Sequence, residues 1–181
     1  TPSMSTRTTL HVDRHSIGTT RLVEVDEAEL AADHVRLAIE QYALTANNIT
    51  YAQFGDMLAY WDFYPVGAEW GNVPAMGYAR VTESNVEGVA VGSRYYGWYP
   101  MATGVDVRAV PTHDGFRDDG DHRAPHAAVY RGFTATDRDP MATGAADEPR
   151  HALLRGLFGT GFLADAFFAA DAYRGADQAI V

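Results

Sequence analysis

Short alternating segments separated by turn residues run along most of the chain up to residue 110, and this pattern restricts the fold more than any other feature. Alternation of apolar and polar residues is typical of half-buried β-strands, and Ser16–Gly18 and Ser84-Asn85 supply turn signals between them. Several short strands joined by turns predict a barrel-like β domain, so we expect a mainly β fold with flanking helices (α+β). The expected strands are Thr8–Val12, Arg21–Val25, Val35–Tyr42, Pro74–Thr82, Tyr95–Trp98 and Val105–Val110.

One of these strands is ambiguous from its pattern. Leu30, Leu37 and Leu44 would share one face of a helix. Val35, Leu37 and Ile39 also alternate with less apolar neighbours, as they would in a strand. Both periods fit, so the pattern alone leaves helix and strand open.

The segment from Thr50 to Tyr64 is unusually rich in aromatic residues. Such a cluster can line an apolar pocket in which phenol hydroxyls position a carbonyl group. It can equally belong to the core, and the sequence favours neither interpretation. The aromatic residues are Tyr51, Phe54, Tyr60, Trp61, Phe63 and Tyr64.

The last part of the chain changes in character. Asp114–Asp121 is polar and is expected as a surface loop, and Asp137–Arg150 has the low apolar content of a linker. His151–Asp171 carries leucine and phenylalanine at helical spacing, and Gln178–Val181 begins like a buried strand. Because a domain rarely ends on such a strand, we expect three parts. They are a substrate domain over residues 1–136, a linker over 137–150 and the start of a truncated nucleotide-binding domain over 151–181.

Composition argues against several classes of function. The 181 residues include 14 Lys and Arg against 24 Asp and Glu, a formal net charge of −10, so nucleic acid and anionic membranes are unsuitable partners. No apolar run approaches the roughly 18 residues expected of a membrane span. The chain has no cysteine, which excludes disulfides, thiolate nucleophiles and cysteine zinc sites. A cysteine-free chain fits a reducing compartment, so we expect a cytoplasmic protein.

Three local motifs have a chemical and a structural interpretation. Gly159–Ala164 matches the G-x-G-x-x-A dinucleotide fingerprint, but the residues before it suit a helix rather than the required strand, so close helix packing is favoured. His122 and His126 could share a metal on a helix, but Pro125 favours a loop. Asp118–Asp121 lacks the spacing and the final glutamate of a calcium loop, which favours a solvated turn.

Three further segments carry ordered motifs. His34–Asn48 ends in a turn that contains Asn47, Val73–Val81 contains P-x-x-G, and Glu87–Gly97 contains G-V-x-x-G-S-R-x-x-G. Together they resemble the N-terminal, GroES-like domain of the medium-chain dehydrogenases and quinone reductases. Acidic residues of the family pattern are replaced here by Thr50, Tyr78 and Ser93.

A closer likeness is to an uncharacterised branch of that superfamily, a domain-of-unknown-function family (family 2855), and it covers nearly the whole chain. It implies a strand at Val35–Tyr42 and a helix at Leu153–Phe168. The overall fold it implies is a GroES-like, partly open β-barrel followed by the first helix and strand of a truncated Rossmann domain. The similar segments are Ala43–Phe54, Tyr60–Pro65, Pro74–Ala79, Val91–Met101 and Leu153–Phe168.

The resemblance implies a zinc-independent oxidoreductase that uses NAD(P)H, preferably NADP, to reduce a carbonyl or an activated alkene, since the cysteine ligands of the zinc alcohol dehydrogenases have no counterpart here. No metal ligand is implied. The implied partners are a small-molecule substrate, the missing C-terminal Rossmann half and, in a homodimer, a second copy. The implied residues are Tyr51, Tyr60 and Thr50 in catalysis, Asn47 and Thr160 at the cofactor, and Trp61, Tyr64 and Tyr99 around the substrate pocket.

Two other interpretations stay open. Fold does not determine function, so the replaced acidic residues allow a non-redox member of the fold, a lyase or a binding protein with no nicotinamide use. A free-standing β-barrel interaction domain, complete at 181 residues, is the second. If the reductase interpretation holds, the chain by itself is expected to be inactive and to bind nucleotide weakly, because most phosphate donors would lie beyond it.

Overall fold

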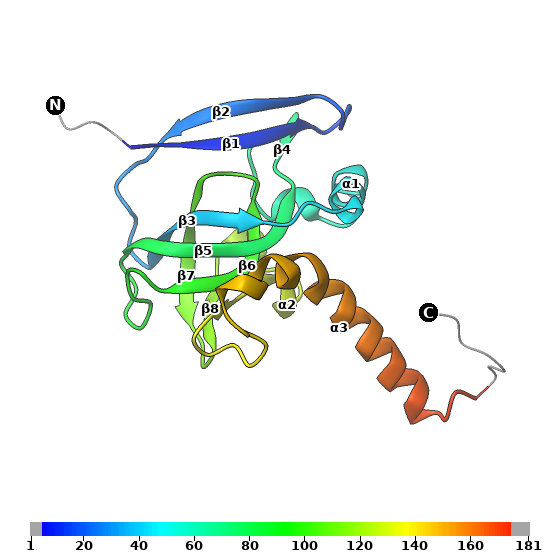
Figure 1. The fold of residues 1–181 in the computed structure, drawn as a ribbon. Helices are drawn as coiled ribbons and strands as arrows, with labels where there is room; N and C mark the ends of the chain where they lie inside the picture. The colour runs from blue at the N-terminus through cyan, green and yellow to red at the C-terminus, as the bar shows by residue number, and fades with distance from the viewer. Residues whose placement is uncertain (1–4, 175–181) are drawn as a thin grey trace.

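The computed structural model describes residues 5–174, and a closed six-stranded barrel forms its centre (Figure 1). Its strands are β3 (His34–Tyr42), β5 (Pro74–Ser84), β6 (Arg94–Pro100), β7 (Gly104–Pro111), β8 (Gly115–Asp118) and β9 (Gly132–Ala135). Their order around the barrel is β3-β5-β6-β9-β8-β7, and every neighbouring pair is antiparallel. The prediction of a mainly β fold is confirmed. The barrel is closed rather than partly open, because residues 34–38 of β3 pair with residues 104–108 of β7.

The barrel interior is filled by the alternate residues that the sequence pattern predicts. Val35 and Leu37 of β3 are completely buried, which confirms this segment as a strand. Phe116 of β8 stacks on Phe133 of β9 with ring centroids 4.6 Å apart. These side chains form one apolar core together with residues of β5, β6 and β7.

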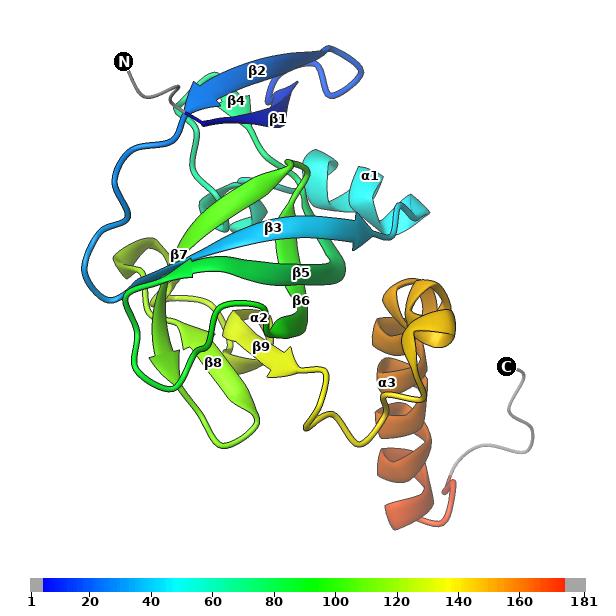
Figure 2. The same ribbon diagram turned by 60° about the vertical axis from the view of Figure 1, so that its left-hand side comes forward.

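A three-stranded sheet lies over one end of the barrel (Figures 1 and 2). Its order is β2-β1-β4, and a second core cluster below it includes Val12 and Trp61. Asn72 ties this sheet to the barrel, since its Nδ2 donates to Thr9 Oγ1 at 2.8 Å and its Oδ1 accepts from the Met101 amide at 3.0 Å. The strands are β1 (Thr6–Asp13), β2 (Thr20–Asp26) and β4 (Trp70–Gly71).

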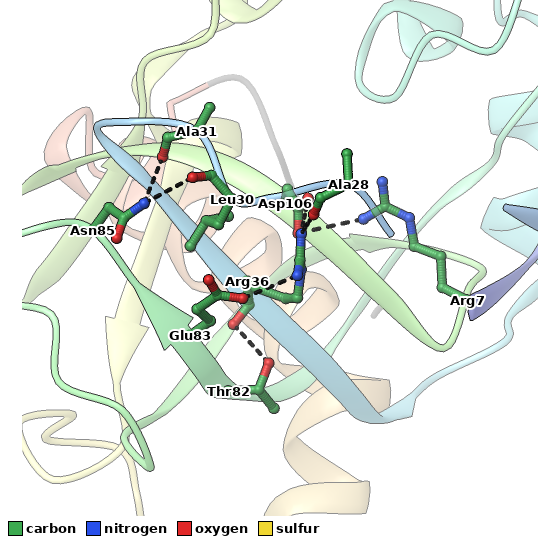
Figure 3. Close-up of polar contacts among 9 residues, drawn as sticks. All are labelled: Arg7, Ala28, Leu30, Ala31, Arg36, Thr82, Glu83, Asn85 and Asp106. Carbon is green, nitrogen blue, oxygen red and sulfur yellow. Dashed lines mark hydrogen bonds and ion pairs between the residues drawn. The ribbon is translucent and has the colours of Figure 1, made fainter. Parts of the chain in front are cut away.

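An arginine of β3 fixes the connection from the sheet to the barrel (Figure 3). The Arg36 guanidinium donates to Asp106 Oδ1 at 2.8 Å through Nε and to the Ala28 carbonyl at 2.7 Å through Nη2. Arg7 of β1 approaches the same Asp106 carboxylate at 3.4 Å. This ion-pair cluster holds the 27–33 connection and β1 against the barrel wall.

The helices lie on the outside of the barrel. The α-helices are α1 (Ala46–Gln53), α2 (Ala128–Arg131) and α3 (Glu148–Ala170), and the 3-10 turns are η1 (Tyr60–Asp62), η2 (Asp121–Arg123) and η3 (Ala145–Asp147). The predicted C-terminal helix is present, but it begins at Glu148 rather than His151. Pro149 suits this position, because the first turn of a helix needs no amide donor there. The predicted strand Gln178–Val181 lies outside the described residues.

Two local predictions were wrong. Asp114–Asp121 is not a surface loop throughout, because Gly115–Asp118 forms β8. Gly115 permits this pairing, since a Cβ there would collide with the Phe133 carbonyl of β9. The expectation of no membrane-length apolar segment was also wrong, because the stretch Ala145–Ala170 is long and apolar enough to cross a membrane by length and composition alone.

Candidate functional site

A groove of about 620 Å³ lies between the barrel and the middle of α3. We call it the groove throughout. Four walls line it, formed by residues of α1, of α2, of the barrel strands β5, β6 and β9, and of α3, and Asp114 of the turn between β7 and β8 adds one acidic side chain. Figures 1 and 2 show α3 alongside this part of the barrel and running away from it toward the C-terminus. The lining residues used below are Asn47, Tyr51, Met76, Tyr96, Trp98, Tyr130, Arg155, Gly159 and Thr160.

The α1 wall is fixed by a capping box. Thr45 Oγ1 accepts from the Asn47 amide at 3.2 Å, and Asn48 Oδ1 accepts from the Thr45 amide at 2.7 Å. The buried Asn48 also donates to the Pro74 carbonyl at 3.0 Å, which anchors the helix to β5. Asn47 and Tyr51 lie one turn apart on α1, so both side chains face the groove.

The aromatic wall is built from three segments that are distant in sequence. The Trp98 ring of β6 lies 5.5 Å from Tyr51 of α1 and 5.4 Å from Tyr130 of α2, measured between centroids. Tyr60 lies behind this wall, with its ring 4.4 Å from that of Tyr51. These tilted and edge-on contacts produce a rigid, mostly apolar surface.

A fully buried arginine supports the α2 wall. The Arg123 guanidinium lies 4.0 Å from the Phe63 ring centroid and donates to the carbonyl of Tyr130. Its Nε lies 3.5 Å from Asp118 Oδ2, and this carboxylate is also buried. Among residues 5–174 the ionic partner of this buried cation is Asp118, and its bond to the Tyr130 carbonyl fixes the short helix that carries Tyr130.

Two ionic contacts hold α3 on the barrel. Glu148 Oε2 accepts from Arg94 Nη2 and from Gln41 Nε2, both at 2.8 Å. About two turns further along, the Arg155 guanidinium is hydrogen-bonded to Asp139. The first contact joins α3 to β6, and the second joins it to the connection that follows β9.

The phenols that line the groove, and that of Tyr60 directly behind it, have raised pKa values. Burial raises the pKa of Tyr51, and the neighbouring Tyr130 adds to this effect. Burial, followed by the adjacent phenols of Tyr130 and Tyr51, raises the pKa of Tyr60 to about 12. Burial likewise raises the pKa of Tyr96 to about 12. At neutral pH these hydroxyls are protonated and serve as hydrogen-bond donors.

A comparison with protein-family models relates this arrangement to known sequences. The model described as "Protein of unknown function (DUF2855)" matches residues 42–181, which include all four walls of the groove. The chain belongs to the DUF2855 family. A search of the curated proteins finds no protein similar to this DUF2855 chain.

The fold of this DUF2855 member brings together three of the residues singled out from the sequence. Asn47, Tyr51 and Thr160 all line the groove. Thr160 lies in the middle of α3, where its Oγ1 donates to the Gly156 carbonyl at 3.0 Å. Tyr60 lies one layer behind the groove, in contact with Tyr51.

Four other residues named from the sequence lie elsewhere. Thr50 is exposed on α1 outside the groove, and Trp61 is 2% exposed in the cluster below the three-stranded sheet. The Tyr64 hydroxyl donates to the Trp98 carbonyl at 2.5 Å, so this ring packs against the barrel core. Tyr99 is completely buried inside the barrel, where its hydroxyl donates to the Tyr95 carbonyl at 2.9 Å.

Sequence reasoning missed several groove residues, although one signal was present. Alternation along β6 directs Tyr95 and Tyr99 into the barrel and therefore directs Tyr96 and Trp98 outward. That alternation predicts Tyr96 and Trp98, rather than Tyr99, as the groove residues of β6. Nothing local indicated Arg155, because its position depends on contacts with distant residues.

The remaining motifs are structural. Gly159–Ala164 lies inside α3, so the fingerprint match is not a strand-to-helix turn. His126 Nε2 lies 2.9 Å from the Ala59 carbonyl, within hydrogen-bond distance. Within residues 5–174, no group of three or more His, Asp or Glu side chains is arranged to hold a metal ion.

Proposed function

We propose that the groove is the substrate and nicotinamide site of a zinc-independent, NAD(P)H-dependent oxidoreductase of the medium-chain dehydrogenase/reductase type, which reduces a carbonyl or an activated alkene. The observation that carries this proposal is the meeting of Asn47, Tyr51 and Thr160 in one groove. Asn47 and Tyr51 lie one turn apart on α1, and Thr160 reaches the same groove from α3, far along the chain. The absence of cysteine supports a route without a thiolate-bound zinc.

The groove residues fit the nicotinamide-ribose end of such a cofactor. Aromatic walls suit a flat ring, while the Asn47 amide and the Thr160 hydroxyl can bond to a carboxamide or to ribose hydroxyls. At Gly159 a Cβ would meet nothing within 4 Å, so the glycine leaves open space in this wall. Arg155 is the one cation among the described lining residues, and Asp139 occupies one edge of its guanidinium, so a single half-paired cation would face all the phosphate charges of the cofactor. Donors for the phosphates would therefore come from outside the groove.

The chain's own residues would bind and orient the substrate. The bound cofactor supplies the hydride. The rings of Tyr51, Trp98 and Tyr130 exclude water from one side of the substrate and hold it at a fixed angle. The protonated Tyr51 hydroxyl donates a hydrogen bond to the substrate oxygen and can pass its proton to the developing alkoxide. Tyr60 supports Tyr51 from behind.

Titration with reduced nicotinamide mononucleotide tests the proposal. We expect saturable shifts of the Asn47 and Thr160 amide resonances, and weaker binding in Asn47→Ala. Thr50→Val is a matched control, because Thr50 is exposed on the same helix outside the groove. Binding without any change at the groove amides would contradict the proposal.

Titration with NADPH provides a second test. Because one half-paired arginine is the only cation among the described lining residues, the additional phosphates of NADPH gain no further partner, and NADPH should bind this chain no more tightly than the mononucleotide does. Micromolar affinity of the 181-residue chain for NADPH would show that this chain does supply donors for the phosphates. Saturable binding of aldehydes without binding of either nicotinamide compound would instead support a non-redox member of the fold.

A further inference from the structure

Arg155 lines the groove with hydrogen-bond donors that its packing contacts leave unpaired within residues 5–174. It lies at the start of the third turn of α3, with its side chain 20% exposed. Its guanidinium carbon lies 4.4 Å from the centroid of the Tyr96 ring. Stacking on a ring fixes the plane of the guanidinium and reduces the entropy lost when it binds a ligand.

One edge of this guanidinium is occupied, and the other is available. Nη1 donates to Asp139 Oδ2, and the Asp139 side chain is only 1% exposed. The second carboxylate oxygen of Asp139 accepts from the Met141 amide at 3.0 Å, so the acid is anchored behind the arginine. Among residues 5–174, Arg155 Nε and Nη2 have no hydrogen-bond acceptor.

We infer that Arg155 binds a carboxylate on the substrate, so that the groove selects an aromatic or conjugated carbonyl compound that carries a carboxylate group. This inference rests on the proposed function of the groove and names its substrate class. The geometry favours it because a guanidinium held by a buried acid on one side and a ring below presents its remaining donors in one plane. A planar carboxylate matches that arrangement with two parallel hydrogen bonds.

The negative net charge of the chain means that an anionic ligand needs a local cation such as Arg155. At −10 the protein repels anions at long range. Affinity for a carboxylate must therefore come from the short-range contact with Arg155. We expect the preference for an anionic ligand to depend on this one side chain.

A pair of probes that differ only in charge tests the inference. 4-Formylbenzoate carries the carboxylate, and methyl 4-formylbenzoate is its neutral ester. The chain contains no lysine, so neither aldehyde can form a lysine imine. In NMR titrations of the wild-type chain, the acid should bind roughly tenfold more tightly than the ester, with shifts at Tyr96 and Arg155.

The variant is designed to keep the fold. Arg155→Gln alone would leave Asp139 buried without a partner, so the double variant Arg155→Gln/Asp139→Asn replaces the ion pair by two amides. It should lose the preference for the acid and keep the affinity for the ester. Arg150→Gln, an exposed arginine of the same helix, should behave as wild type.

The outcomes separate this inference from the function it builds on. Equal affinity of wild type for the two probes, or a preference that survives in the double variant, would overturn the role of Arg155 and leave the groove as a substrate site. If neither probe shifts any groove resonance, the proposed function and the inference both fail.

Discussion

Trp61 illustrates how single residues determine the packing of this fold. Its indole is 2% exposed and lies between Gly55 and Gly71, and a Cβ at either glycine would overlap the ring. Gly71 belongs to β4 and pairs with Val12, so the missing side chain allows the sheet to approach the indole. The lack of a side chain at Gly55 and Gly71 thus leaves room for Trp61, the largest fully buried side chain among the described residues.

Gly71→Ala should destabilise the protein. The added methyl group must displace Trp61 or the strand, and overpacking of this kind lowers the free energy of unfolding by about 1–3 kcal/mol. Urea denaturation measures the change. Gly18→Ala is the control, because a Cβ there meets nothing within 4 Å and should leave stability equal or slightly higher. A Gly71→Ala variant as stable as wild type would contradict this account of the packing.

The buried phenols predict a loss of stability in alkaline solution. The pKa of Tyr96 rises to about 12 through burial, against about 10 in an unfolded chain. The folded state therefore holds its proton more tightly, and the stabilisation is complete below pH ~10 and is lost between pH ~10 and ~12. The Tyr96→Phe variant should show a shallower fall in that window, by at most about 1.4 kcal/mol per pH unit. Urea denaturation at a series of pH values measures both slopes, and identical slopes would refute the assignment.

At the scale of elements, the attachment of α3 decides the shape of the groove. Glu148 and Ala152, in the first turns of the helix, are its buried residues, and its later residues are largely exposed. Gly156 lies against the end of the Met76 side chain of β5, so a Cβ there would require the methionine to move aside. The groove therefore depends on a few contacts at one end of a 23-residue helix.

Glu148→Gln should loosen α3 without unfolding the barrel. The change removes a charge-assisted bond from Arg94, which is worth about 1.5–3 kcal/mol, while Arg94 keeps its contact with Glu40. Hydrogen exchange should accelerate in the first turns of α3 and stay unchanged in β3 and β5. Arg150→Gln breaks an exposed pair with Asp147 and should leave both stability and exchange in α3 nearly unchanged. Unchanged exchange in α3 would show that other contacts hold the helix.

At the scale of the whole molecule, the outer part of α3 is the main exposed apolar surface. Eight large apolar side chains on it are between 41% and 75% exposed. A helix that is apolar on all sides is usually covered by other protein or by lipid. The exposed side chains are Leu153, Leu154, Leu157, Phe158, Phe162, Leu163, Phe167 and Phe168.

The isolated chain should therefore bind a hydrophobic dye strongly and associate as its concentration rises. Phe162→Gln/Phe168→Gln removes two exposed rings, and each ring is worth about 1.5–3 kcal/mol when buried. Dye fluorescence and light scattering should both fall, while the melting temperature should change little because neither ring packs on the barrel. Unchanged dye binding in the double variant would place the apolar surface elsewhere.

The strands and the long helix could be predicted from the sequence, because local periodicity controls them. Val35 and Leu37 alternate with their neighbours, and the leucines and phenylalanines after residue 151 repeat at helical spacing. Each pattern depends on residues only a few positions apart. Asn47, Tyr51 and Thr160 were named as site residues from motifs of the same short range.

Tertiary structure alone decided how those elements close and which side chains meet. The pairing of β3 with β7 closes the barrel, and Gly115 forms a strand only because the Phe133 backbone lies against it. Arg155 enters the groove because Asp139 and Tyr96 hold it there. Such contacts join residues far apart in sequence, and their energies depend on burial and distance, which no local pattern records.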